Sequence, residues 1–167
     1  MDKNFSVTQY APEHRGACAE LFRKVYGSPP FGFDWLGASK ASMYFLDLEN
    51  IPGAHSFILK DKDRIVGLCM GQKEEHFQTP GYKINEFCID PEYQHMGLGS
   101  YLINEMENRL REGGIKSISL FTQRDMESFD FYRKNNFIQN DDTVHMVRII
   151  QQEPTIIYTR TFLNSNG

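Results

Sequence analysis

The sequence has few cysteines, no long apolar run and no excess of basic residues, and each shortage excludes a class of protein. Three cysteines in 167 residues, Cys18, Cys69 and Cys88, cannot all pair within one chain, and no two form a Cys-x-x-Cys motif. This argues against a disulfide framework and against a zinc ribbon. No stretch approaches the roughly 18 apolar residues of a membrane span, and the first residues show no apolar segment. We therefore expect a cytoplasmic protein that has no membrane partner.

Basic charge is also scarce. Lys and Arg number 18 against 22 Asp and Glu, which gives a net charge of −4, and a basic footprint for nucleic acid is missing. We expect no nucleic-acid partner. The five histidines are scattered without metal-ligand spacing, so no metal is expected either. The remaining composition, 40% hydrophobic and 24% charged, is ordinary for a globular protein. The length predicts a single domain over residues 1–167.

Hydrophobic periodicity predicts an α/β protein with one mixed sheet. The element order is β-α-α-β-β-β-α-β-α-β-β, with strands at 5–10, 55–60, 64–72, 82–89, 116–121, 144–150 and 156–162, and helices at 11–27, 36–48, 98–113 and 125–135. The strand at 82–89 is apolar on both faces, one of which carries Ile84, Glu86 and Cys88; this is typical of a central strand. Crossovers in the middle predict parallel pairing and the hairpins antiparallel pairing, with helices on both faces of the sheet.

A glycine-containing run between this strand and the next helix is the most informative segment. Its residues are Gln94, His95, Met96, Gly97, Leu98, Gly99 and Ser100. Glycines at a helix start leave backbone N–H groups uncovered, and the helix dipole adds to them, so the run suits a phosphate or pyrophosphate. The alternative is a strand–helix turn that needs only glycine flexibility. The run lacks the lysine of a Walker A loop and the small residue of a dinucleotide fingerprint at Leu102.

Two longer segments resemble the GNAT superfamily of acyl-CoA-dependent N-acetyltransferases. The run Glu86-Phe87-Cys88-Ile89-Asp90-Pro91-Glu92-Tyr93-Gln94-His95-Met96-Gly97-Leu98-Gly99 is similar to that family's strand, turn and (Q/R)-x-x-G-x-(G/A) signature, and the run Phe131-Tyr132-Arg133-Lys134-Asn135-Asn136-Phe137 is similar to its late F-Y-x-K-x-G-F segment. The resemblance covers essentially the whole chain. It implies the mixed α/β fold of the family and acetyl-CoA as co-substrate, with acetyl transfer to a primary amine.

The resemblance also implies which residues bind the cofactor. The N–H groups from Gln94 through Ser100 would hold the pyrophosphate of CoA, and the backbone of Phe87, Cys88 and Ile89 would pair with the pantetheine arm. Two positions depart from the family pattern. Asp125 stands where an asparagine usually bonds the pantetheine arm, which puts that bond in doubt, and Asn136 replaces a glycine but tolerates a left-handed turn.

The chemistry needs a base for the amine and an acid for the departing thiolate. Glu86 is the candidate base because burial on a central strand raises a carboxyl pKa; the alternative is a structural carboxylate bonded to a neighbouring element. The resemblance implies that Tyr132 is the acid, and the alternative is a core aromatic. A ping-pong route through Cys88 is disfavoured, because no cationic partner is evident that would lower its pKa. Direct transfer is therefore the prediction.

The sequence says less about which amine accepts the acetyl group and which residues bind it. Phe31, Phe33 and Trp35 lie between the first two helices, where they either line the acceptor or cap the core, and Glu74 with Glu75 and Glu86 would favour a cationic amine. A small-molecule amine and a peptide amine both stay open, with a slight preference for the former. A homodimer is also left open by the resemblance. Two rival functions are a catalytically silent acyl-CoA-binding or sensing domain and transfer of a longer acyl group.

Overall fold

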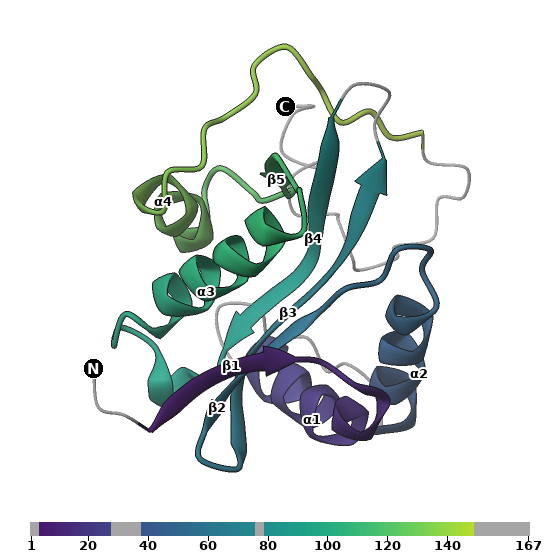
Figure 1. Cartoon of the computed structure of the whole chain (residues 1–167), viewed down its shortest axis with the longest axis vertical. Coiled ribbons are helices and arrows are strands. Elements are labelled where there is room, and N and C mark those ends of the chain that lie inside the picture. Colours follow the sequence, from purple (N-terminus) through teal and green to yellow (C-terminus); the bar gives the residue numbers. More distant parts are fainter. Residues whose placement is uncertain (1–3, 28–37, 76–78, 149–167) are drawn as a thin grey trace, which may run out of the picture. The chain divides into compact units, whose positions relative to one another are not determined.

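The computed structural model describes residues 4–27, 38–75 and 79–148. The chain divides into two compact units, one ending at Asn136 and the other starting at Phe137. The first unit contains a five-stranded sheet whose strand order follows the sequence, β1-β2-β3-β4-β5 (Figure 1). Its elements, in chain order, are β1 (Phe5–Gln9), η1 (Pro12–His14), α1 (Arg15–Tyr26), α2 (Ala38–Glu49), β2 (Phe57–Asp61), β3 (Arg64–Glu75), β4 (Pro80–Ile89), η2 (Pro91–Tyr93), α3 (Leu98–Glu112), β5 (Ser117–Ser119) and α4 (Glu127–Lys134).

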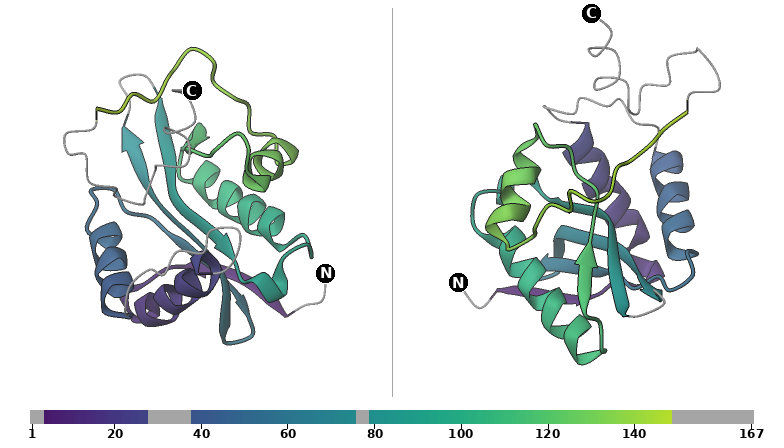
Figure 2. Two further views of the ribbon diagram at one scale, coloured as in Figure 1. Left: turned by 180° about the vertical axis from the view of Figure 1, so that it is seen from behind. Right: turned by 90° about the horizontal axis from the view of Figure 1, so that it is seen from above.

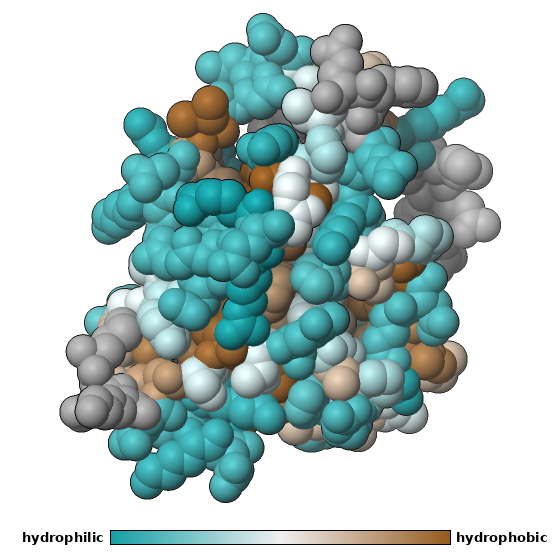
Figure 3. Space-filling model, viewed as in Figure 1, coloured by the Kyte–Doolittle hydropathy of each residue, from teal (hydrophilic) through white to brown (hydrophobic). Residues whose placement is uncertain are grey.

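The helices of this unit cover both faces of the sheet. Helices α1 and α2 pack on one face, and α3 and α4 lie on the other (Figure 2). The apolar stripe that predicts α3 is buried in full: Leu98, Leu102, Met106 and Leu110 are each at most 2% exposed. Polar residues take the outer surfaces, and the face in Figure 3 is mostly hydrophilic with scattered apolar side chains. The α/β fold class with helices on both faces is confirmed.

The sheet is mixed, as the element order predicts. Strands β1 to β4 pair antiparallel with their neighbours, and β4 pairs parallel with β5. The parallel pairing joins 81–83 to 117–119 and then stops. Among the described residues, no strand pairs with 84–89 on the side away from β3. We call the backbone of residues 84–89 on that side the outer edge of β4.

A β-bulge in β4 corrects the predicted faces of that strand. Met70 of β3 pairs with Glu86, but the next residue, Gly71, pairs with Ile84, so Asn85 is the extra residue. Paired residues share a face of the sheet, and an extra residue reverses the alternation beyond it. Ile84 therefore lies on the α3 face, while Glu86 lies on the α1 face; the prediction that they share a face was wrong.

The predicted hairpin after α4 falls outside the first unit. Residues 144–148 form no strand in the described part of the chain, and Val144 and Met146 are 80% and 86% exposed. The prediction of a strand at 144–150 is therefore wrong for 144–148, since an alternating pattern becomes a strand only where a neighbouring backbone supplies hydrogen bonds. The partner strand expected at 156–162 lies outside the described residues.

Candidate active site

The glycine-containing run links the end of β4 to the start of α3. His95 and Gly97 have left-handed backbone, with φ of 60° and 77°, and Gly97 is the N-cap of α3. The first intrahelical bond runs from the N–H of Tyr101 to the carbonyl of Gly97, at 3.0 Å. Within the described residues, the N–H groups from His95 to Ser100 have no protein acceptor. The run therefore presents consecutive donors at the positive end of a 15-residue helix.

The two glycines of the run meet different needs. Gly97 adopts a left-handed conformation that a side chain would strain. Gly99 is helical, but a Cβ placed there would lie 2.9 Å from Cζ and 3.0 Å from Cε2 of Phe131 on α4. Close packing of α3 against α4 thus excludes a larger residue at this position.

A buried aspartate, Asp90, fixes the chain just before the run by several hydrogen bonds. Asp90, 2% exposed at the end of β4, accepts hydrogen bonds from Lys24 of α1 at 2.7 Å and from Arg64 of β3 at 2.9 Å. Its carboxylate also accepts the N–H of Glu92 at 3.0 Å and so caps η2. Burial alone would raise the pKa of Asp90, but the bonds from Lys24 and from the Glu92 N–H lower it. The carboxylate is therefore ionised and fixes the chain where it turns into the run.

Backbone direction along β4 decides which groups face its outer edge. The N–H of Asp90 donates to Val66 of β3 at 2.8 Å, and alternate residues of an antiparallel ladder direct their backbone groups to the same side. The backbone of Cys88 therefore faces β3, while that of Phe87 and Ile89 faces the outer edge. The Ile89 carbonyl already accepts from Nε2 of Gln94 at 3.0 Å.

Glu86 lies on the α1 face beside the outer edge. Its Oε2 accepts a hydrogen bond from Oη of Tyr26 at 3.2 Å, and its Oε1 accepts one from Oη of Tyr44. Burial raises the pKa of Glu86, and the two phenolic bonds oppose that shift without cancelling it. The carboxyl group can accept a proton more readily than an exposed glutamate, which is the property that a general base needs.

Tyr132 reaches the same edge from the opposite face. Its ring lies on α4 with its centroid 6.2 Å from that of Phe87 and 5.2 Å from that of Phe131. Burial is the main cause that raises the pKa of Tyr132 well above its usual value, and the neighbouring Cys69, Glu86 and Cys88 add to the shift. The phenol is therefore a protonated donor. Glu86 and Tyr132 are brought together from the two sides of β4.

The three thiols lie in the core and are not activated. Burial raises the pKa of Cys18 and of Cys69 to about 12, and it raises the pKa of Cys88 well above its usual value. All three are free cysteines with buried side chains. A thiolate is the nucleophilic form of cysteine, so none of these residues is poised to carry an acyl group.

The remaining predicted residues lie apart from this pair or outside the described structure. Asp125 is exposed in the turn before α4, and Glu74 is half-buried near the end of β3. Glu74 is on the same face as Met70, the cross-strand partner of Glu86, but four residues further along, a distance of about 13 Å. Phe31, Phe33 and Trp35 lie outside the described residues.

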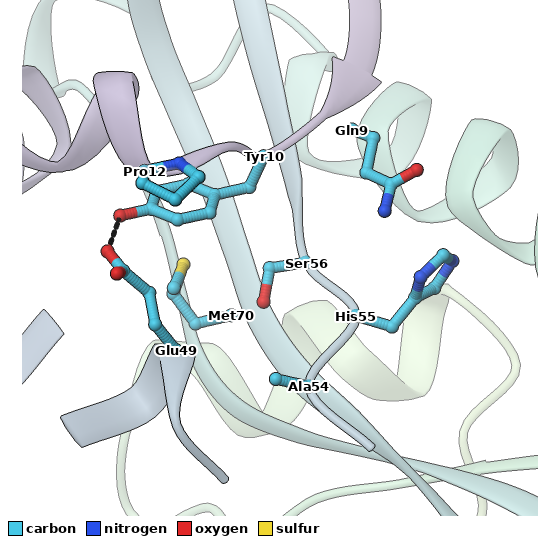
Figure 4. A pocket seen from close by; sticks show the side chains of 8 residues that line it. All are labelled: Gln9, Tyr10, Pro12, Glu49, Ala54, His55, Ser56 and Met70. Atoms are coloured by element: carbon cyan, nitrogen blue, oxygen red, sulfur yellow. Dashed lines mark hydrogen bonds between the residues drawn. The ribbon is translucent and has the colours of Figure 1, made fainter. Parts of the chain in front are cut away.

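A pocket of about 150 Å³ opens at the end of β1 and α2 (Figure 4). Tyr10 donates a hydrogen bond to Glu49 there at 2.5 Å, and Arg15 pairs with the same carboxylate. The pocket includes none of the predicted site residues. Met70, one of the residues that line the pocket, is the cross-strand partner of Glu86.

Two tyrosines of the site were missed by the sequence analysis. Tyr26 is the last residue of α1 and Tyr44 lies within α2, and both belong to the apolar helix faces by their spacing. Their partner Glu86 is 60 and 42 residues away in the sequence. No local motif marks such a contact, because it depends on how two helices pack on the sheet.

Neither a metal centre nor a membrane span emerges from the described structure. Among residues 4–27, 38–75 and 79–148, no three His, Cys, Asp or Glu side chains gather closely enough to hold a metal ion. In the same ranges, no helix is long and apolar enough to cross a membrane.

Comparisons with known proteins point to one family. The model of the acetyltransferase (GNAT) family matches residues 19–137. The uncharacterized N-acetyltransferase ycf52 of Porphyra purpurea is 33% identical over 81 residues, which are 48% of this chain and 44% of that protein. The chain thus spans about half the length of the curated relatives it matches.

Solved structures show the same fold at low identity. An aminoglycoside acetyltransferase from an uncultured soil metagenomic sample superposes with a TM-score of 0.70 and 20% identity, covering 90% of this chain and 99% of that one. A possible acetyltransferase from Clostridium difficile 630 gives a TM-score of 0.74 at 15% identity, over 89% of this chain and all of that one.

Proposed function

The chain belongs to the GNAT acetyltransferase family, and from that premise we propose that it transfers an acetyl group from acetyl-CoA to a primary amine by direct attack. One observation supports the proposal above the others. The outer edge of β4 has the Glu86 carboxylate on one face of the sheet and the Tyr132 phenol on the other. A thioester that lies along this edge would have a base and an acid on its two sides.

The residues at this end of the sheet fit acetyl-CoA. The donors from His95 to Ser100 suit the pyrophosphate of the co-substrate, and the helix dipole of α3 favours its negative charge. Of the three residues expected to pair with the pantetheine arm, Phe87 and Ile89 direct their backbone groups to the outer edge, whereas Cys88 faces β3. We therefore propose that only Phe87 and Ile89 bond the arm. Asp125, which is exposed in the turn before α4, remains a proposed contact of the pantetheine arm.

Glu86 is the proposed base for the amine. An ammonium has no lone pair with which to attack the thioester, so a proton must leave the acceptor nitrogen. Glu86 takes that proton, directly or through a water molecule, as the nitrogen bonds to the thioester carbonyl carbon. Its raised pKa brings its affinity for the proton closer to that of the substrate.

Tyr132 is the proposed acid for the leaving group. When the C–S bond breaks, the electron pair stays on the sulfur, and the phenolic proton of Tyr132 passes to it. The raised pKa of Tyr132 keeps the phenol protonated until that moment. Transfer through an acyl-cysteine is not part of the proposal, since burial keeps Cys88 in its thiol form.

The acceptor is proposed only as a primary amine, either a small molecule or the amine of a peptide. Glu74 and Glu86 lie on the same face of the sheet and favour an acceptor that carries a positive charge. Phe31 and Trp35 remain proposed contacts of the acceptor, and a homodimer remains a proposal as well.

The test measures acetyl-CoA-dependent thiol release with a panel of polyamines, aminoglycosides, amino acids and short peptides. We expect turnover with one class of amine, and a loss of about 10²-fold or more in kcat for Glu86→Gln and for Tyr132→Phe, with acetyl-CoA affinity kept. Unchanged kcat in both variants would refute the assigned roles. Binding of acetyl-CoA without turnover across the panel would favour a sensing domain, and stronger competition by longer acyl-CoAs would favour a longer acyl group.

A further inference from the structure

Two phenols from two different helices converge on one buried carboxylate. Tyr26, at the end of α1, donates to Oε2 of Glu86 at 3.2 Å, and Tyr44, in α2, donates to Oε1. Each oxygen of the carboxylate thus has its own donor. A carboxylate accepts about four hydrogen bonds, so two bonded phenols leave capacity for an amine proton.

The rings that carry these phenols are fixed in the core between α1 and α2. The ring of Phe22, which is 3% exposed, lies 4.4 Å from that of Tyr26 and 5.7 Å from that of Tyr44, centroid to centroid. Phe45 packs edge-on against Phe22 and Tyr44 as well. The phenolic oxygens are therefore held in place before any substrate arrives, so the bonds to Glu86 need no rearrangement.

The phenols are also the groups that favour the charged form of Glu86. Burial raises the pKa of Glu86, and the bonds from Tyr44 and Tyr26 lower it. The other titratable groups that face it, Tyr132 of α4 and Cys88 of β4, are neutral because their own pKa values are raised. Within the described residues, no lysine or arginine forms an ion pair with Glu86.

We propose that Tyr26 and Tyr44 are positioning residues that hold the Glu86 carboxylate ionised and in a fixed orientation, ready to take the proton of the acceptor amine. We call the pair the tyrosine clamp. The proposal rests on the proposed role of Glu86 as base. The clamp supplies the hydrogen bonds that a buried carboxylate otherwise takes from water or from a cation, and its two phenols add no positive charge beside Glu86.

The experiment is the pH profile of kcat/KM for Tyr44→Phe, Tyr26→Phe and the double variant. Each substitution keeps the ring and removes one hydrogen-bond donor to the carboxylate. The ionised form of Glu86 is then less stable, so its pKa rises. We expect the acid limb of the profile to move to higher pH by about one unit for Tyr44→Phe and further for the double variant. At high pH, where Glu86 is ionised again, the loss of kcat/KM relative to the parent should be smaller than at low pH.

Tyr10→Phe is the matched control. It removes the same kind of bond, from a phenol to the carboxylate of Glu49 at 2.5 Å, in a part of the fold away from the site. Its acid limb should stay in place. A merely structural clamp would lower kcat at every pH without moving the limb, and that result would overturn the proposal.

A failure of the proposed function gives a different result. If Glu86→Gln keeps its activity, Glu86 is not the base, and both the assigned role and the clamp are overturned. A different outcome is that Glu86→Gln is inactive while the acid limbs of the Tyr44→Phe and Tyr26→Phe profiles lie at the same pH as that of the parent. In that case the role of Glu86 as base is kept and only the proposed role of the clamp is overturned. Thermal unfolding of each variant shows that the compared proteins are folded.

Discussion

Substitution of one glycine in α3 should be harmful, whereas the same substitution in α1 should not. Gly99 and Gly16 are each the second residue of their helix, and neither has a positive φ. A Cβ at Gly16 would meet nothing within 4 Å, but a Cβ at Gly99 would lie 2.9 Å from the ring of Phe131. The two sites therefore differ in their surroundings and not in their backbone.

The expected magnitudes follow from two opposed effects. Replacing a helical glycine by alanine stabilises by about 0.5 kcal/mol, chiefly through the unfolded chain. Overpacking costs roughly 1–3 kcal/mol, and Phe131 cannot simply swing away because its ring contacts Phe87 and Tyr132. Gly99→Ala should thus lose roughly 1–2 kcal/mol of unfolding free energy, while Gly16→Ala should gain about 0.5 kcal/mol.

The assay is thermal and urea unfolding of both variants beside the parent. A difference of about 2 kcal/mol between them corresponds to roughly 4–8 °C in Tm for a chain of this size. Gly99→Ala should also lower turnover, since a displaced Phe131 shifts its neighbour Tyr132. Equal Tm values for the two variants would refute the argument, because they would show that α4 yields to the added methyl group at no cost.

Three further predictions concern other parts of the fold. The thiols of Cys18, Cys69 and Cys88 should resist iodoacetamide at pH 8 in the native protein and react on unfolding, as mass spectrometry would show. Asp90→Asn should lose about 1–3 kcal/mol of unfolding free energy at pH 7, a range that covers hydrogen bonds to a charged group. Because the folded pKa of Asp90 is lowered, its stabilisation is present above about pH 4 and declines as the pH falls further. The urea midpoints of variant and parent should therefore converge in acid. Gly53→Ala should lower Tm, because φ is +81° and a Cβ would lie 2.6 Å from the Lys73 carbonyl oxygen.

The parts of the site that depend on local patterns could be predicted from the sequence. The stripe from Leu98 to Leu110 locates α3, and the glycines before it indicate a helix start that suits an anion. The proposed base and the proposed acid rest on separate grounds, Glu86 on its place in a buried strand and Tyr132 on a segment that resembles the family. The structure brings them to the two sides of one strand.

The bulge in β4 could not be predicted, because neither glycine nor proline marks it. Asn85 and Glu86 are two consecutive polar residues that interrupt the alternation, and the side chain of Asn85 bonds Gln72 on β3. Two adjacent polar residues do not by themselves show that one of them will be left out of the ladder, since they also occur where a strand ends or turns to solvent. Yet the bulge is what places Glu86 on the α1 face, away from the face that Ile84 takes.

The end of α1 shows why contacts across elements matter for the proposed reaction. Its last turn contacts the chain beyond the bulge at two points: Tyr26 bonds Glu86 of β4, and Lys24 bonds Asp90, which follows β4. The first contact bears on the proposed base, and the second bears on the run that would hold the pyrophosphate. One helical turn therefore supports both the proposed base and the proposed pyrophosphate site. A shift of this turn would disturb both together, so binding and proton transfer are expected to be sensitive to the same part of the fold.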